Sequence, residues 1–196
     1  MMTNQLHLPF TTAADLETLA HPLDAFYAEA GAPLPPIQRI EGQTLRQPLR
    51  DLLVHSNDMT PTLEAFYGGN IHLRVLQHRR QGEEYQREVV LQLDGTNEPV
   101  EFGANRIRLD LFPEEAQRLI LEEREPLGHI LRDFSVLHTC EPNAFFRVAS
   151  DHLINEALGL RGAQILYGRH NRLFNSNGQL ISEVVEILRP PGIPRS

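Results

Sequence analysis

The sequence lacks the features that mark several classes of protein. Only one of its 196 residues, Cys140, is a cysteine, so an internal disulfide and a cluster of thiolates are both excluded. No apolar stretch is long enough to cross a bilayer, and the N-terminal residues form neither a basic leader nor an apolar signal core. We therefore expect a soluble protein of the reducing cytoplasm that does not insert into membranes.

Basic charge and recognisable catalytic motifs are also scarce. The formal net charge of −8 argues against a surface that grips phosphate backbones, so nucleic acid is not an expected partner. The nine histidines are scattered, with no HExxH motif and no cysteine-rich companion, and the sequence predicts no metal site. No Ser-His-Asp spacing, glycine-rich phosphate loop or Cys-His nucleophile signature is present.

The chain divides into two parts by composition. Residues 1–48 are rich in proline and alanine, carry one helical pattern from Asp15 to Ala30, and are predicted to form an N-terminal arm. Residues 49–196 have the size and hydrophobic content of one compact domain with a single core.

Apolar residues alternate along three consecutive stretches of this domain, at 71–78, 86–95 and 100–113, which predicts an antiparallel meander. Prolines and acidic first turns indicate helices at 113–124 and 126–134, a further helix follows Asp58 in DMTPTLEAFYG, and a longer one is predicted from Asn143 to Leu158. Two last strands flank the turn signal Asn177-Gly178. The pattern predicts an α+β fold in which helices pack on one face of an antiparallel sheet.

One charged residue interrupts the apolar face of its strand. Arg87 shares a face with Val89, Leu91 and Leu93, and a guanidinium does not lose its proton, so on the core side it must meet an anion or carbonyl oxygens. Alternatively, Arg87 snorkels at the edge of the sheet or pairs with an internal carboxylate.

The last strand carries two glutamates on opposite faces, Glu183 and Glu186. Both faces are apolar, so alternation does not decide which glutamate points inward. An inward glutamate either neutralises an arginine in a structural ion pair or binds a small ligand together with it.

The remaining polar residues have less distinctive patterns. Arg106 falls on the polar face of its strand unless a bulge at Gly103-Ala104 turns it inward, and Arg169 and Arg172 are predicted on a solvent face. Cys140 is expected to pack as a small hydrophobe or to lie in a loop. Met59, an apolar side chain in a polar turn, must fold over a core or cover a pocket.

These stretches together resemble the chorismate lyase (chorismate pyruvate-lyase) family, in particular its diverged branch. The resemblance covers roughly residues 49–190 and rests on NDMT at 57–60, the QRE strand with Asp94-Gly95, PLG at 126–128, YGRHNRLF at 167–174, and a glutamate before Pro190. It implies an antiparallel sheet with helices on one face and a ligand cavity closed by helix-turn flaps.

The resemblance also implies roles for individual residues. Arg87 would hold a ring carboxylate, Met59 and Leu127 would form walls at the flaps, and a glutamate would meet a 4-hydroxyl. Spacing to Pro190 favours Glu186 for that glutamate, with Glu183 as the alternative. Arg106 matches a second family arginine only after a shift of one or two residues near Gly103.

The implied function is a carbon–oxygen lyase that eliminates pyruvate from chorismate to give 4-hydroxybenzoate, a quinone precursor, without a metal or redox cofactor. A non-catalytic, sensor-like domain that binds a small aromatic acid is the alternative, and a related enzyme for another enolpyruvyl acid is a third possibility. In each case the expected partner is a small aromatic or enolpyruvyl acid.

Overall fold

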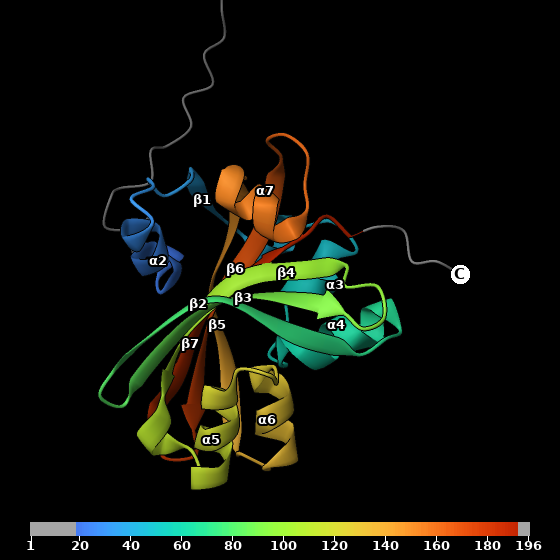
Figure 1. Ribbon diagram of the computed structural model, residues 1–196. Helices are drawn as coiled ribbons and strands as arrows, with labels where there is room; N and C mark the ends of the chain where they lie inside the picture. Colours follow the sequence, from blue (N-terminus) through green and yellow to red (C-terminus); the bar gives the residue numbers. More distant parts are fainter. Residues whose placement is uncertain (1–18, 192–196) are drawn as a thin grey trace, which may run out of the picture.

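The computed structural model describes residues 19–191, which fold around one seven-stranded antiparallel sheet (Figure 1). The strand order is β1-β5-β6-β7-β4-β3-β2. The sheet is strongly twisted, so that β2, β3 and β4 cross in front of β5, β6 and β7. The strands are β1 (Ile37–Ile40), β2 (Ile71–Gln81), β3 (Glu84–Leu93), β4 (Pro99–Arg108), β5 (His138–Ala149), β6 (Ile165–Asn175) and β7 (Leu180–Leu188).

Helices cover both faces of the sheet. One face carries α3 (Leu49–Leu53), α4 (Met59–Tyr67), α5 (Glu114–Glu122) and α6 (Leu127–Asp133), and the other carries α2 (Leu23–Glu29) and α7 (His152–Leu158). Two short 3₁₀ turns, η1 (Gly42–Thr44) and η2 (Leu109–Leu111), complete the elements. Adjacent residues of β3 show the division: Val89 belongs to the hydrophobic cluster that includes Leu63 of α4, whereas Val90 belongs to the cluster of α2 and α7.

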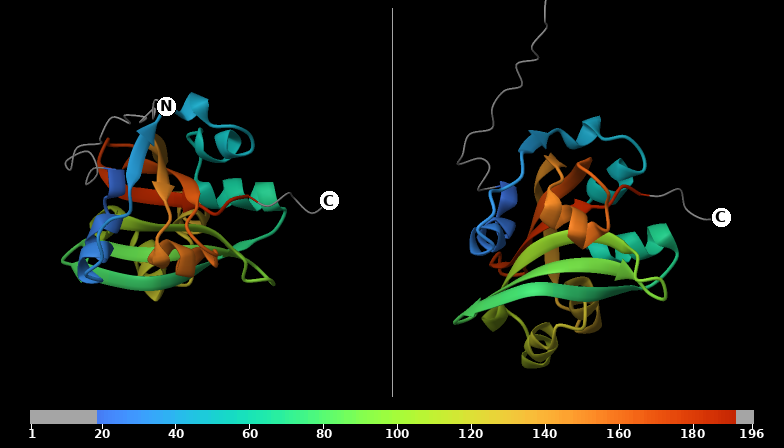
Figure 2. Two further views of the ribbon diagram at one scale, coloured as in Figure 1. Left: turned by 90° about the horizontal axis from the view of Figure 1, so that it is seen from above. Right: turned by 45° about the horizontal axis from the view of Figure 1, so that its top comes forward.

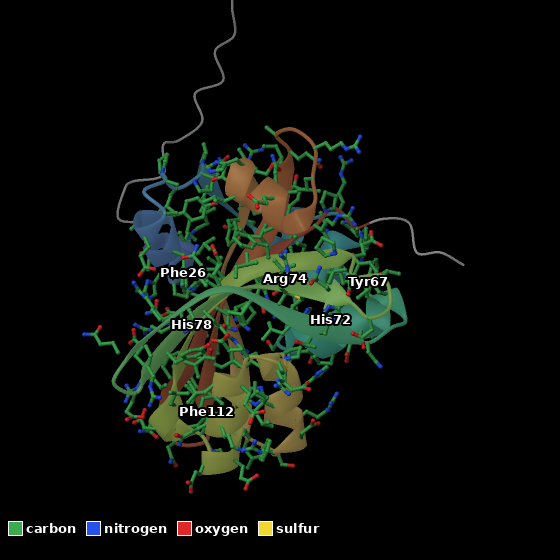
Figure 3. The ribbon with its side chains drawn as sticks, in the orientation of Figure 1. Phe26, Tyr67, His72, Arg74, His78 and Phe112 are labelled. Atoms are coloured by element: carbon green, nitrogen blue, oxygen red, sulfur yellow. The ribbon has the colours of Figure 1, made fainter. Side chains whose placement is uncertain are left out.

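Each face has its own hydrophobic packing. Phe26 of α2 and Phe112, which precedes α5, are both buried and lie on opposite sides of the sheet (Figure 3). Helix α7 lies against β4, as the tilted view makes clear (Figure 2). The predicted α+β fold with an antiparallel sheet is confirmed, and α2 and α7 are an addition on the face opposite α3–α6.

The predicted helix from Asn143 to Leu158 is wrong over most of its length. Residues 138–149 form β5, which pairs with β1 on one side and β6 on the other, and the helix begins only at His152. Phe145 and Ala149 have helical spacing, but Phe146 and Val148 also alternate, and pairing with two neighbouring strands selects the extended form. The Asp151 side chain then accepts a hydrogen bond from the Ile154 amide (3.0 Å) and caps α7.

The segment assigned by composition to an N-terminal arm contributes to the sheet. Residues Ile37–Ile40 form β1, which pairs with β5 at Ile37 opposite Val148. Of the helix expected from Asp15, residues 15–18 lie outside the described part of the chain, and α2 spans Leu23–Glu29. No helix among residues 19–191 is long and apolar enough to span a membrane.

Candidate functional site

The sheet register brings residues of four strands together on the face that carries α3–α6. Reading across β3, β4, β7 and β6, the first row is Arg87, Asn105, Val184 and Asn171, and the second row is Val89, Gly103, Glu186 and Arg169. In the third row Leu91 and Glu101 lie beside Leu188. Because side chains alternate along each strand, all three rows point to the same face.

A cavity of about 50 Å³ lies over these rows, between the sheet and α4 and α6. Its walls are mainly apolar, formed by Met59, Leu73, Val89, Leu91, Leu127, Leu131, Leu173 and Val184. Polar groups enter it at several points, from Arg87, Asn105 and Asn171 in the first row and from Glu101 and Glu186 further along. Apolar walls with a few convergent polar groups are typical of a small-molecule site.

Gly103 lets the backbones of β4 and β7 approach each other closely in the second row. A Cβ at this position would lie only 2.0 Å from the backbone oxygen of Val185, so no larger residue fits without moving β7.

Arg87 is fully buried and incompletely bonded. Its Nε donates to Asn105 Oδ1 (3.2 Å), its Nη2 makes a long 3.5 Å contact with the Glu125 carbonyl, and its Nη1 has no protein partner. β3 is flanked by two strands, so Arg87 does not snorkel at an edge, and within residues 19–191 it makes no ion pair with a carboxylate. Burial lowers the pKa of Arg87 to about 10, which still leaves a cation at neutral pH.

The prediction that Arg169 lies on a solvent face is wrong. Its side chain is fully buried, and its Nε donates a short hydrogen bond to Oε2 of Glu186. Its Nη groups donate to backbone oxygens of the α3–α4 segment, those of Leu53 (3.3 Å), His55 (3.0 Å) and Asn57 (3.2 Å). Arg169 therefore neutralises Glu186 and holds the segment that leads into α4 over the cavity.

Glu101 is a cavity residue that the sequence analysis did not identify. It is buried, and its Oε2 has no hydrogen-bond partner among the described residues. Burial, and then the nearby Glu186 carboxylate, raise the pKa of Glu101 well above its usual range, whereas Arg169 lowers it. One feature of the sequence could have identified Glu101. It shares a face of its strand with Gly103 and Asn105, and that strand pairs with the one that carries Arg87.

Helices α4 and α6 close the cavity and contact each other. Met59 and Leu127 are both buried cavity-wall residues, at the first positions of α4 and α6. A Cβ on Gly128 would approach Thr60 Oγ1 to 3.0 Å, and His129 Nε2 lies 2.9 Å from Glu64 Oε1. Met59 is thus buried under this pair of helices although its turn is polar.

Glu183 and Arg106 lie on the opposite face of the sheet. Arg106 Nη2 is 3.0 Å from Glu183 Oε2, and His170 Nε2 is 3.3 Å from Glu183 Oε1. Burial would raise the pKa of Glu183, but His170, Arg106 and His21 together lower it. The structure therefore brings Arg87, Glu186, Met59 and Leu127 to one cavity and places Arg106 and Glu183 in a separate ion-pair cluster.

A scan of protein-family models finds no match to the sequence, and a search of curated proteins finds none either. Among solved structures, the effector domain of PhnF from Mycobacterium smegmatis aligns with a TM-score of 0.52 at 13% identity, covering 68% of this chain and 88% of that domain. PhnF itself aligns with a TM-score of 0.51 at 13% identity, covering 85% and 93%. The ligand-binding domain of a GntR-family transcriptional regulator from Bordetella bronchiseptica aligns at 0.46, with 15% identity, covering 63% and 89%.

These comparisons correct the prediction of a carbon–oxygen lyase. The two structures with TM-scores above 0.5 are the effector domain of PhnF and PhnF itself, and neither is described as a lyase. The glutamate expected to act on a substrate hydroxyl, Glu186, is already bound by Arg169. The chain has the chorismate-lyase-like fold, shared with the effector domain of PhnF.

Proposed function

We propose that this domain is a non-catalytic, sensor-like module that binds a small aromatic acid in the cavity over β3, β4, β6 and β7. The observation that supports this most strongly is Arg87, a fully buried guanidinium that borders the cavity with Nη1 unpartnered and no carboxylate of the described residues at ion-pair distance, although the more distant Glu123 charge raises its pKa. A buried cation without a counter-ion is costly, and a ligand carboxylate would remove that cost.

The charges around the cavity favour a monoanion. Arg169 and Glu186 neutralise each other, and burial of Glu101 raises its pKa, which favours its neutral form. Asp58 at the rim faces His138, whose Nε2 is 3.0 Å away. Arg87 then contributes the one positive charge left uncompensated among the cavity residues of the described chain.

The remaining groups favour an aromatic body with a polar substituent. The apolar side chains of α4, α6 and the strands form the walls, and such surfaces suit a flat ring. Beyond the ring, a neutral Glu101 can both donate and accept a hydrogen bond, as a hydroxyl substituent requires. The closed cavity of about 50 Å³ is smaller than a benzoate, so this proposal requires α4 and α6, which carry Met59 and Leu127, to move apart before they cover the ring.

The test is equilibrium binding to 4-hydroxybenzoate, measured by calorimetry with 4-hydroxybenzamide as the neutral analogue. We expect the acid to bind and the amide to bind at least about 30-fold more weakly, since losing a buried charge pair costs about 2 kcal/mol or more. Arg87→Met should weaken binding of the acid by a similar factor.

Arg106→Met is the matched control, because this arginine also projects from a central strand but on the opposite face. It should keep the wild-type affinity. Equal losses in both variants, or no binding of the acid by the wild type, would overturn the proposal. Release of pyruvate from added chorismate would contradict the non-catalytic part.

A further inference from the structure

Three groups that ligate metals meet outside the cavity floor, at the start of α4. Asp58 Oδ1 lies 3.0 Å from His138 Nε2 and 3.3 Å from Cys140 Sγ, and the three atoms all lie within 4.8 Å of one another. Zinc bonds of about 2.0 Å to nitrogen and oxygen and about 2.3 Å to sulfur place tetrahedral ligand atoms roughly 3.3–3.7 Å apart. Small side-chain shifts would bring this cluster to that geometry.

The orientation of His138 supports the same conclusion. Its Nδ1 lies 2.7 Å from the Val136 carbonyl, to which it donates, so Nε2 is the ring nitrogen directed at Asp58 and Cys140. Metal-bound histidines commonly donate their other ring N–H to a carbonyl in this way, because the bond fixes the ring and its tautomer.

The strand geometry presents His138 and Cys140 together. They are residues i and i+2 of β5, so both side chains project from the same face, towards Asp58 at the N-cap of α4. Asp58 and His138 are half-buried and Cys140 is buried, and all three residues line an open cleft of about 930 Å³. A fourth ligand can therefore reach it from solvent.

We propose that Asp58, His138 and Cys140 form a binding site for one divalent transition-metal ion of the zinc class, with an open fourth position facing the cleft. Carboxylate, imidazole and thiolate together suit Zn²⁺ or Co²⁺ better than Ca²⁺ or Mg²⁺, which prefer oxygen ligands. This proposal is independent of the function assigned to the cavity.

The site would join two elements that are far apart in the sequence. Asp58 precedes α4, and the other two ligands lie in β5, 80 and 82 residues further along the chain. Asp58 also borders the ligand cavity, next to Met59 and Thr60. A bound ion would fix the start of α4 against the sheet.

The experiment uses the full chain without a polyhistidine tag, after chelator treatment and dialysis. Titration with Zn²⁺ against a chromophoric chelator gives stoichiometry and affinity, and titration with Co²⁺ reports thiolate ligation through its ligand-to-metal charge-transfer absorption. We expect one equivalent of metal and a clear thiolate band. Cys140→Ser should abolish the band and, like His138→Gln, weaken Zn²⁺ binding at least about tenfold.

His72→Gln is the matched control. Like His138, His72 lies close to an aspartate, with its Nδ1 2.7 Å from Asp94, but no cysteine of the described residues completes a three-ligand cluster there. It should bind Zn²⁺ like the wild type. The absence of a thiolate band in the wild type overturns the proposal, and this outcome does not depend on whether any variant folds. Zn²⁺ binding that survives both Cys140→Ser and His138→Gln overturns it as well, and then the three residues form a hydrogen-bonded cluster only.

Discussion

Arg87 and Glu88 are neighbours in β3, and they point to opposite faces of the sheet. Both are buried and neither has an ion-pair partner among the described residues. Glu88 can become neutral by binding a proton: burial, and then the charge of Asp151, raise its pKa to about 7. Arg87 has no such option, because its pKa of about 10 keeps it cationic.

Each face also carries charged side chains that are paired with side chains of opposite charge. On the face of Glu88, Arg106 and His170 surround Glu183. On the cavity face, Arg169 is bonded to Glu186, whereas Arg87 has no bonded carboxylate among the described residues. Burial of charge is thus common to both faces, and the feature that distinguishes the proposed site is a buried charge that the protein itself does not neutralise.

The largest expected effect on stability comes from replacing Arg169, the arginine of the cavity face that is bonded to a glutamate. Arg169→Met leaves the Glu186 carboxylate buried without its cation and removes three hydrogen bonds to backbone oxygens of the α3–α4 segment. We expect the free energy of unfolding to fall by about 3–5 kcal/mol, measured by urea denaturation.

The double variant Arg169→Met/Glu186→Leu is the control for this prediction. Removing both charges together leaves neither member of the pair as an uncompensated buried ion, so the double variant should recover much of the lost stability. A double variant as unstable as the single one would show that Arg169 acts mainly through its backbone contacts.

A smaller effect, of opposite sign, is expected for Glu88→Gln. Because the folded pKa of about 7 exceeds the unfolded value near 4.5, Glu88 does not destabilise the wild type below pH 4.5, and its destabilising effect grows as pH rises through 7. Glutamine does not ionise, so at pH 8.5 the variant should be more stable than the wild type by up to about 3 kcal/mol.

At pH 4.5 the advantage of Glu88→Gln should disappear, which urea denaturation at both pH values can test. Glu83→Gln, at an exposed position in the β2–β3 turn, is the control and should change little at either pH. A Glu88→Gln variant that is less stable at pH 8.5 would contradict the argument.

The smallest effect is expected for the stability of Arg87→Met. No carboxylate loses its partner, and a desolvated charge is removed, so the free energy of unfolding should change by less than about 1 kcal/mol or increase. Arg106→Met instead separates Glu183 from one of its cations and should cost about 1 kcal/mol. Urea denaturation of the two variants under the same conditions tests this. A larger loss of unfolding free energy for Arg87→Met than for Arg106→Met would mean that Arg87 is structurally paired.

Local patterns predicted most of the sheet and one residue of the candidate site. Alternation in β3 placed Arg87 on an apolar face, and the structure places it there. The same reasoning put Arg169 in solvent, because the sequence YGRHNRLF is polar on both faces and does not reveal that Glu186 lies opposite in β7. Glu101 was overlooked for a similar reason, since its neighbours Gly103 and Asn105 do not make an apolar face.

The sequence alone determined the strands with clear alternation, the helices with prolines at their starts, and the presence of an arginine that could not become neutral. Only the tertiary structure decided that β5 is a strand, that Glu186 belongs to Arg169, and that Asp58 meets His138 and Cys140. Spacing along the chain describes interactions within a few residues, whereas these three outcomes depend on pairing between strands and segments distant in sequence.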